Sequence, residues 1–388
     1  MSKVLMIVQN DFVNDSRIIK EASILAKNGY DVKVLALHNN DLLEQECIQG
    51  FKVKRIKLYT RNRLGKNEFI QAIKYLEFKK KCKEEALSFL PDIVHCHDVY
   101  TLPIGEEIVK KIRKIKNVKF VYDSHELWPE ASNNLSMPKI LLNIQNMIEG
   151  KIIRKCDKVI TVSESIVNYL KEKYNLGEYP VLLRNIPYKH SSIENRKLFH
   201  KELNIEENKK IVIYQGVIGS GRGIENLIKA MKYTNENIVL VLLGNGNKVD
   251  EYKNIVIKNE LQNKIYFHEA VDPSVLIKYT SSADLGMSMI MNICLSYYYS
   301  LPNKMFEYIQ SEIPVICSNY PDMSEIISKY NVGEVANADS YNDIAESINK
   351  ILSDEDICQI YKNNCKLAKK QLNWEEESKK LINLYNEL

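Results

Sequence analysis

Short apolar runs alternate with longer stretches of helical periodicity along the whole chain. The first half holds runs with the length and β-branched content of buried strands, at residues 3–9, 30–37, 91–97, 118–124, 156–163 and 179–185. Stretches with helical periodicity lie between them, among them 67–89 and 138–154. This alternation predicts parallel crossover units, and therefore an α/β fold with a doubly wound sheet.

The same alternation starts again after a polar interruption. Residues 186–210 are polar and contain no sustained apolar strand, so we place an interdomain linker there. Further strand candidates follow at 210–216, 236–246, 263–269, 283–289 and 313–318. The final stretch, "NWEEESKKLINLYNEL", has the apolar spacing of an amphipathic helix. We expect a second Rossmann-like domain, with ligands bound beyond the carboxyl ends of the strands.

The composition is that of an ordinary globular protein. Of 388 residues, 45% are apolar and 27% are charged, which favours two compact domains and argues against long disorder. Eight cysteines without a C-x-x-C pair indicate reduced thiols in a cytosolic protein. The chain lacks a signal-peptide pattern and any apolar run of ~18 residues. We therefore expect a cytoplasmic protein, either soluble or peripheral to a membrane.

The formal charge of +4 is mild, but basic residues gather between residues 52 and 83. Two interpretations stay open for this basic segment: a solvated surface, or contact with an anionic membrane. Nucleic acid is not an expected partner, because no recognition motif accompanies the charge.

A glycine-rich turn follows the first strand of the second half. The stretch "YQGVIGSGRGIENLI" leads from a strand into a helix, and its glycines let the backbone approach a ligand closely. A P-loop would need Lys and Ser or Thr where Arg222 and Gly223 stand. A dinucleotide fingerprint would need an acid after the next strand, which instead ends "VLLGNGN". We predict a phosphate-binding turn with Arg222 as its charge partner; a connector that only turns the chain is the alternative.

Histidine stands beside an acid at the ends of two consecutive strands. The stretch "IVHCHDVYTLP" holds His95, His97 and Asp98, and "VYDSHELWPE" holds His125 and Glu126. We expect no metal site, because two histidines on one strand face lack a further convincing set of ligands. His125 leaves its strand into a loop, where it can bond a substrate hydroxyl or phosphate. A histidine that caps the following helix is the alternative.

A single acid lies one turn inside a predicted helix in "SYYYSLPNKMFEYIQSEIPVICS". Ser300 or Leu301 is the expected N-cap, and Pro302 an early helical residue. The free N–H groups of residues 303–305 would then suit a diphosphate, and Glu307 could accept two hydrogen bonds from a ribose diol. A Glu307 that only forms a surface salt bridge is the alternative.

Together these motifs resemble the GT-B glycosyltransferases, close to glycosyltransferase family 4. The likeness runs in order through nearly the whole chain, from "NDSRIIKEASILAKNGYDVKVLAL" through "DIVHCHD", "VYDSHEL", "DKVITVSESIVNYLKEKY", "VLLRNIP" and "QGVIGSGRGIENLI" to "LLGNG" and "SLPNKMFEYIQSEIPVICSNYPDMSEII". It implies two Rossmann-like domains that face a central cleft. Residues 1–190 would form the acceptor-binding domain and 205–370 the donor-binding domain, with a helix at about 371–388 that packs back on the first.

The resemblance also implies a reaction. A nucleotide-diphosphate sugar, with UDP favoured and GDP possible, would give its sugar, with retention, to a glycan or a polyprenyl or other lipid-linked acceptor. The role would be in bacterial cell-surface polysaccharide or glycoconjugate synthesis, without an obligatory cofactor or metal. The expected catalytic residues are His125, Arg222 and Lys304. The expected donor-binding residues are Gly216, Gly221, Arg222, Gly244, Val271, Tyr299, Ser300, Asn303, Lys304, Met305 and Glu307. The expected acceptor-side residues are Asp15, Arg17, His97, Asp98 and Glu126.

Two positions depart from the family pattern. Many members carry an acid eight residues before the one at Glu307, where this chain has Tyr299, and an arginine where it has Val217. A nucleotide-sugar epimerase of the same fold and a catalytically degenerate binding subunit therefore remain alternatives.

Overall fold

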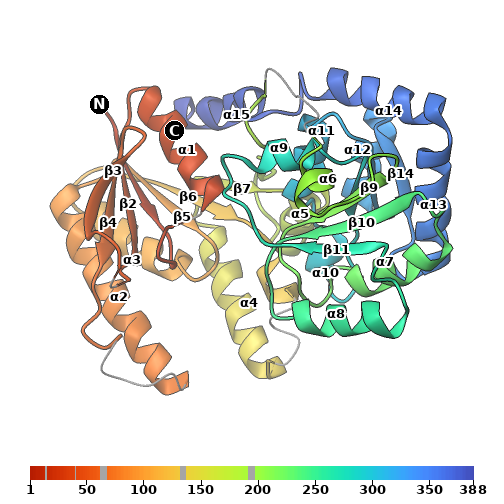
Figure 1. The fold of residues 1–388 in the computed structure, drawn as a ribbon. Coiled ribbons are helices and arrows are strands. Elements are labelled where there is room, and N and C mark those ends of the chain that lie inside the picture. The colour runs from red at the N-terminus through yellow and green to blue at the C-terminus, as the bar shows by residue number, and fades with distance from the viewer. Residues whose placement is uncertain (14, 40, 62–67, 132–136, 191–196) are drawn as a thin grey trace. The chain divides into compact units, whose positions relative to one another are not determined.

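The computed structural model of the chain forms two compact units. Unit 1 consists of residues 1–183 and 378–388, and unit 2 of residues 184–377. All residues are described except 14, 40, 62–67, 132–136 and 191–196, so parts of the basic segment and of the expected linker lie outside the described residues. Figure 1 shows that each unit is built around its own sheet.

The sheet of unit 1 has the strand order β3-β4-β2-β1-β5-β6-β7-β8, and every pair is parallel except β3 with β4. Its strands are β1 (Lys3–Ile7), β2 (Asp31–Leu37), β3 (Gln45–Ile48), β4 (Phe51–Ile56), β5 (Ile93–His97), β6 (Lys119–Ser124), β7 (Lys158–Thr161) and β8 (Val181–Leu182). The central strand β5 is buried along its whole length, as expected for a strand covered on both faces.

The helices of unit 1 connect these strands. They are α1 (Ser16–Lys27), α2 (Glu68–Phe89), α3 (Leu102–Ile112), η1 (Trp128–Glu130), α4 (Lys139–Ile153) and α5 (Glu164–Lys173). The last helix, α15 (Trp374–Asn386), begins in unit 2 and belongs to unit 1 from residue 378 onward. Its Tyr385 hydroxyl lies 2.8 Å from Nδ1 of His95, which ties the end of the chain to β5.

The sheet of unit 2 has the order β11-β10-β9-β12-β13-β14, and all its pairs are parallel. Its strands are β9 (Lys210–Gln215), β10 (Ile238–Leu243), β11 (Ile265–His268), β12 (Leu285–Ser288), β13 (Val315–Ser318) and β14 (Gly333–Ala336). Its helices are α6 (Leu198–Glu202), α7 (Ile224–Ala230), η3 (Met231–Tyr233), α8 (Val249–Lys258), α9 (Leu276–Thr280), α10 (Leu295–Tyr298), α11 (Asn303–Gln310), α12 (Pro321–Tyr330), α13 (Tyr341–Ser353) and α14 (Glu355–Ala368).

Two hydrophobic cores cover the two faces of the second sheet. Along β9, Val212 and Tyr214 belong to one core and Ile211 and Ile213 to the other, as the two-residue period of a strand requires. The predicted pair of doubly wound α/β domains is confirmed. Among the described helices, none is long and apolar enough to cross a lipid bilayer.

Each sheet reverses its strand order at one point. In unit 1, β1 pairs with β2 on one side and β5 on the other; in unit 2, β9 stands in the same way between β10 and β12. Ligands of such sheets bind at these switch points, outside the carboxyl ends of the strands. The residues that follow β5, β6 and β9 are therefore in position to form sites.

Three features differ from the sequence-based expectation. The interpretation of residues 52–83 as a run of charge overlooked β4, where exposed Lys52 alternates with buried Phe51 and Val53. The short strands β3 and β14 were not predicted either. The expected N-cap at Ser300 or Leu301 is wrong, because Pro302 is the N-cap and α11 begins at Asn303.

Candidate active site

A pocket of about 660 Å³ opens at the carboxyl end of β9 in unit 2. It brings together predicted donor-binding residues that are far apart in the sequence. These are Gly216, Arg222, Gly244, Val271, Asn303, Lys304 and Glu307. The pocket therefore lies at the switch point of its sheet, where a nucleotide is expected in a Rossmann-like domain.

Glycine is required where the turns after β9 and β10 meet. Gly244 has a φ of +143°, and a Cβ atom added to it would lie 2.0 Å from the carbonyl oxygen of Gly216. Gly216 has a φ of +119°, and a Cβ atom there would lie 3.6 Å from Nζ of Lys304. Side chains at these two positions would push the turns apart and fill the space beside the lysine.

Two cations line this pocket. Nζ of Lys304 lies 3.7 Å from the ring centroid of Tyr214, and the guanidinium of Arg222 lies 5.1 Å from that of Tyr297. Burial and the charge of Arg222 lower the pKa of Lys304 to about 7, although Glu307 opposes this shift. Two cations that repel each other in one pocket are arranged to bind an anion with more than one charge.

The carboxylate of Glu307 is held by a chain of buried side chains. The amide Nε2 of Gln215 donates to Oε2 of Glu307, and the hydroxyl of Thr280 lies 2.7 Å from Oε1 of Gln215. The backbone N–H of Gln215 donates to the Tyr308 hydroxyl at 3.2 Å. The strand end, α9 and α11 together therefore fix the orientation of one carboxylate oxygen at the pocket wall.

The remaining predicted donor-binding residues do not line this pocket. The described lining residues do not include Gly221, Tyr299, Ser300 or Met305. Met305 is fully buried in the core, and its N–H, which the sequence analysis expected to be free, donates to the Pro302 carbonyl at 3.1 Å. The Tyr299 ring lies 5.5 Å from that of Tyr298, so it packs within the tyrosine run.

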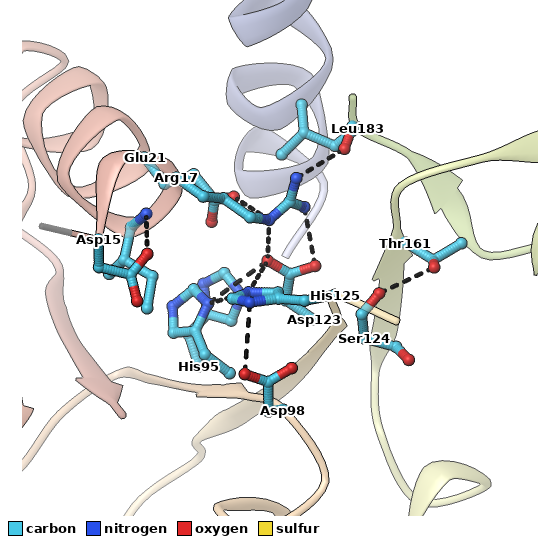
Figure 2. Close-up of polar contacts among 12 residues, drawn as sticks. Asp15, Arg17, Glu21, His95, Asp98, Asp123, Ser124, His125, Thr161 and Leu183 are labelled. Atoms are coloured by element: carbon cyan, nitrogen blue, oxygen red, sulfur yellow. Dashed lines mark hydrogen bonds and ion pairs between the residues drawn. The ribbon is translucent and has the colours of Figure 1, made fainter. Parts of the chain in front are cut away.

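In unit 1, a buried carboxylate organises the ends of β5 and β6 (Figure 2). Arg17 on α1 donates to both oxygens of Asp123, at 2.7 and 2.8 Å, and to the Leu183 carbonyl at 2.8 Å. Burial acts to raise the pKa of Asp123, but the charges of Arg17 and His125 hold it well below its usual range. Asp123 is thus ionised beside His125, and the bidentate contact with Arg17 fixes the orientation of its carboxylate.

His125 lies between two carboxylates. Its Nε2 is 3.0 Å from Oδ2 of Asp123 and 3.2 Å from Nδ1 of His97, and its Nδ1 is 3.4 Å from Oδ2 of Asp98. Burial lowers the pKa of His125, but Asp98 and Asp123 outweigh burial and raise it to about 9. At neutral pH, His125 is therefore an imidazolium that can donate hydrogen bonds.

The structure separates the predicted acceptor-side residues into two groups. Arg17 and His97 are buried and contact Asp123. Asp98 and Glu126 are accessible at the strand ends. Asp15 is the N-cap of α1 and accepts from the Ile18 N–H.

Sequence reasoning missed several residues of these sites. Asp123 lies in the same motif as His125, but the sequence around an acid in a strand does not show that an arginine on α1 will contact it. Gln215, at the end of β9, and Thr280 were missed because their roles depend on side-chain contacts across three elements.

Four buried residues of unit 1 have metal-ligand chemistry. The ligand atoms of Glu21, His95, His97 and Asp123 lie within 4.8 Å of one another, so the expectation that the histidines lack further ligands is wrong. However, Nε of Arg17 lies 3.0 Å from Glu21 and 2.7 Å from Asp123, so a cation already contacts both acids. We assign no metal to this cluster.

Two non-overlapping family matches cover most of the chain. Residues 18–182 match the family described as Glycosyltransferase Family 4, and residues 195–368 match Glycosyl transferases group 1. With its two Rossmann-like units, the chain is a glycosyltransferase of the GT-B class. Within that class, it belongs to the family 4-like glycosyltransferases.

Several relatives resemble the chain over most of its length. An uncharacterized glycosyltransferase of Methanocaldococcus jannaschii is 24% identical and covers 93% of this chain and 90% of its own. The chitobiosyldiphosphodolichol beta-mannosyltransferase of Kluyveromyces lactis is 22% identical, with 97% of this chain and 88% of its own covered.

Solved structures share the fold. Sucrose-phosphate synthase from Thermosynechococcus elongatus superposes with a TM-score of 0.81 at 18% identity, covering 100% of this chain and 99% of its own. Anabaena HepE, solved in complex with UDP-glucose, gives a TM-score of 0.78 at 15% identity, with 100% of both chains covered. At these identities the likeness shows the GT-B fold alone.

Proposed function

We propose that the enzyme transfers a sugar from a nucleotide-diphosphate donor, with UDP favoured over GDP, to a glycan or lipid-linked acceptor. The observation that carries the proposal is the pocket beyond β9, which is lined by Arg222, Lys304 and Glu307, with Glu307 held by Gln215. A diphosphate needs cations, and a ribose diol needs a fixed carboxylate. HepE supports the UDP part, since it was solved with UDP-glucose.

The same residues give the leaving group its stabilisation. As the bond between sugar and diphosphate breaks, negative charge builds on the diphosphate oxygens. Arg222, Lys304 and the N–H groups at the start of α11 would receive that charge without an obligatory metal. In this proposal, Lys304 is protonated once the diphosphate is bound, because an adjacent anion favours its charged form.

On the acceptor side, the proposal assigns His125 a hydrogen-bonding role. Held as an imidazolium by Asp98 and Asp123, it would donate to the transferred sugar or to the acceptor and would not remove a proton from either. The named substrate of the Kluyveromyces lactis relative supports a lipid-linked acceptor. Retention, a role in bacterial surface polysaccharide or glycoconjugate synthesis, and work at the cytoplasmic membrane face rest on the family resemblance.

The donor site is tested by calorimetry with UDP and GDP and by turnover of their sugars. Glu307→Gln and Arg222→Ala should each weaken nucleotide binding by about tenfold or more, because each removes a charged contact worth ~1.5–3 kcal/mol. Glu325→Gln, at an exposed acid of the same unit, is the matched control and should bind normally. Unchanged binding and turnover in both site variants would sink the proposal.

A further inference from the structure

Helix α4 carries a stripe of large apolar side chains on its exposed face. Its members are Ile140, Leu141, Ile144, Met147 and Ile148, which are between 42% and 73% exposed. Their spacing places them along one side of a helix. A soluble helix normally turns such a stripe toward the core, so this arrangement is the reverse of the expected one.

The buried face of α4 explains why the apolar stripe of the helix is turned outward. The only acid in α4, Glu149, is buried and accepts hydrogen bonds from the hydroxyls of Tyr122 at 3.0 Å and Tyr174 at 2.7 Å. Ile152 and Ile153 are buried beside it. Two tyrosines therefore hold the one acid of the helix inside unit 1, and the exposed face of α4 contains no acid.

Cations accompany the apolar stripe. Lys151 is one turn beyond Met147 on the same side of the helix, while Lys139 and Arg154 are exposed at its two ends. Within the described part of the chain, none of these three side chains has an ion-pair partner. Unit 1 as a whole holds 32 Lys and Arg against 24 Asp and Glu, a formal charge of +8, whereas unit 2 holds 22 against 26.

The basic segment at 52–83 is different, because its described cations are largely neutralised. The pairs are Lys52–Asp31 at 3.1 Å, Lys54–Glu85 at 3.1 Å, Arg55–Glu46, Lys57–Glu44 at 3.0 Å, Lys79–Glu107 at 2.7 Å, Lys81–Glu77 at 3.1 Å and Lys83–Glu107 at 3.4 Å. Opposite charges at these distances cancel most of the field that would attract an anionic surface.

We infer that the exposed face of α4 is a membrane-docking surface that inserts its apolar stripe into the interface of an anionic lipid bilayer. An apolar face that is free of acids, and whose flanking cations form no ion pair with any described residue, matches that surface in both chemistry and charge. Figure 1 shows α4 (yellow) extending beyond the strands of its own unit. The inference extends the proposed function, since a lipid-linked acceptor is presented at a bilayer.

The test is sedimentation of the full chain with phosphatidylcholine vesicles that contain, or lack, a third of phosphatidylglycerol. The wild type should bind the anionic vesicles, and Ile144→Ser with Met147→Ser should weaken this binding at least tenfold, because two apolar side chains leave the bilayer. Lys151→Gln should weaken it about fivefold and reduce the salt dependence. The matched control, Ile257→Ser with Ile360→Ser, removes two exposed isoleucines of unit 2 and should bind as the wild type does.

Equal binding by the wild type and the stripe variant would overturn the inference, as would wild-type binding that ignores phosphatidylglycerol. If the protein self-associates without lipid and the stripe variant does not, the exposed face of α4 binds a second copy of the chain. This result would also overturn the inference. Binding of UDP, measured on the same samples, reports on the donor pocket separately. Normal UDP binding with failed docking therefore rejects only the docking surface, and the opposite pattern rejects only the proposed function.

Discussion

At the scale of single residues, Lys304 has the most unusual charge state in the donor pocket. Its pKa of about 7 means that part of the population is neutral at physiological pH. Burial and the charge of Arg222 disfavour the charged form of Lys304 until an anion binds.

Binding of UDP should therefore draw a proton onto Lys304. The charged form of Lys304 is lost as pH rises through about 7, so affinity should fall between pH 7 and pH 9. Calorimetry at pH 8 in two buffers of different ionisation heat should show proton uptake, in a range where the phosphates of UDP are already ionised. Lys304→Arg, which stays charged, should abolish both the uptake and most of the pH dependence. Uptake that persists in this variant would contradict the assignment.

Thr280 tests whether the orientation of Glu307 matters. Thr280→Val keeps the shape of the side chain but removes the hydroxyl 2.7 Å from Gln215, leaving a buried amide oxygen without its donor. We expect the KM for the donor to rise several-fold, for a loss of ~1 kcal/mol, with kcat little changed. Thr234→Val, at another buried threonine of unit 2, is the matched control. An equal change in both variants would indicate a general loss of packing.

The sequence predicted charged residues that line the pocket beyond β9, but not the residues that support them. Arg222 lies in the turn after a strand, and Lys304 and Glu307 lie in the first turns of a helix, positions that periodicity helps to find. The contacts of Gln215 with Thr280 and Glu307, and of Asp123 with Arg17, depend on which side chains meet across separate elements. No local pattern in one sequence predicts such contacts between side chains of separate elements.

At the scale of elements, the two glycine turns after β9 and β10 act as one structure. The carbonyl of Gly216 lies where a side chain of residue 244 would have to go, so the turns pack backbone against backbone. This contact places Gly216 beside Lys304 and leaves room for a ligand at the strand ends.

Gly244→Ala should therefore cost both stability and ligand binding. The added methyl group would lie 2.0 Å from backbone, at a φ that alanine rarely adopts, and we expect a loss of ~3 kcal/mol or more in the free energy of unfolding. Gly219→Ala is the matched control, because its added carbon meets only side-chain atoms at 3.6 Å. Thermal unfolding and UDP titration of the two variants make the comparison. Equal Tm values would show that the turns can separate without cost.

The prediction of elements was most successful for buried parallel strands. Runs such as "IVLVLL" in β10 are apolar throughout because both faces of the sheet are covered. The missed strands are β3, β4 and β14. In β4, which lies between β3 and β2, exposed Lys52 alternates with buried residues, so its sequence looks like a run of charge. The start of α11 was placed too early, since a proline fits both the N-cap and the first turn.

At the scale of the whole molecule, the two units have opposite formal charges. Unit 2 holds a cationic pocket within an otherwise acidic unit, whereas unit 1 is basic and surrounds His125 with anions. Fold and enzyme class follow from family matches over both units. In the proposed function, the identity of the donor depends on the pocket lined by Arg222, Lys304 and Glu307.

The most direct test of the proposed activity is a hydrolysis and transfer assay on a panel of UDP and GDP sugars, with and without lipid-linked acceptors. We expect at least one nucleotide sugar to be consumed with release of its nucleoside diphosphate, faster with a suitable acceptor. That turnover should be lost in Glu307→Gln and Arg222→Ala and kept in Glu325→Gln. If no nucleotide sugar is consumed or bound by the wild type, or if both site variants turn over normally, the proposed donor site is wrong.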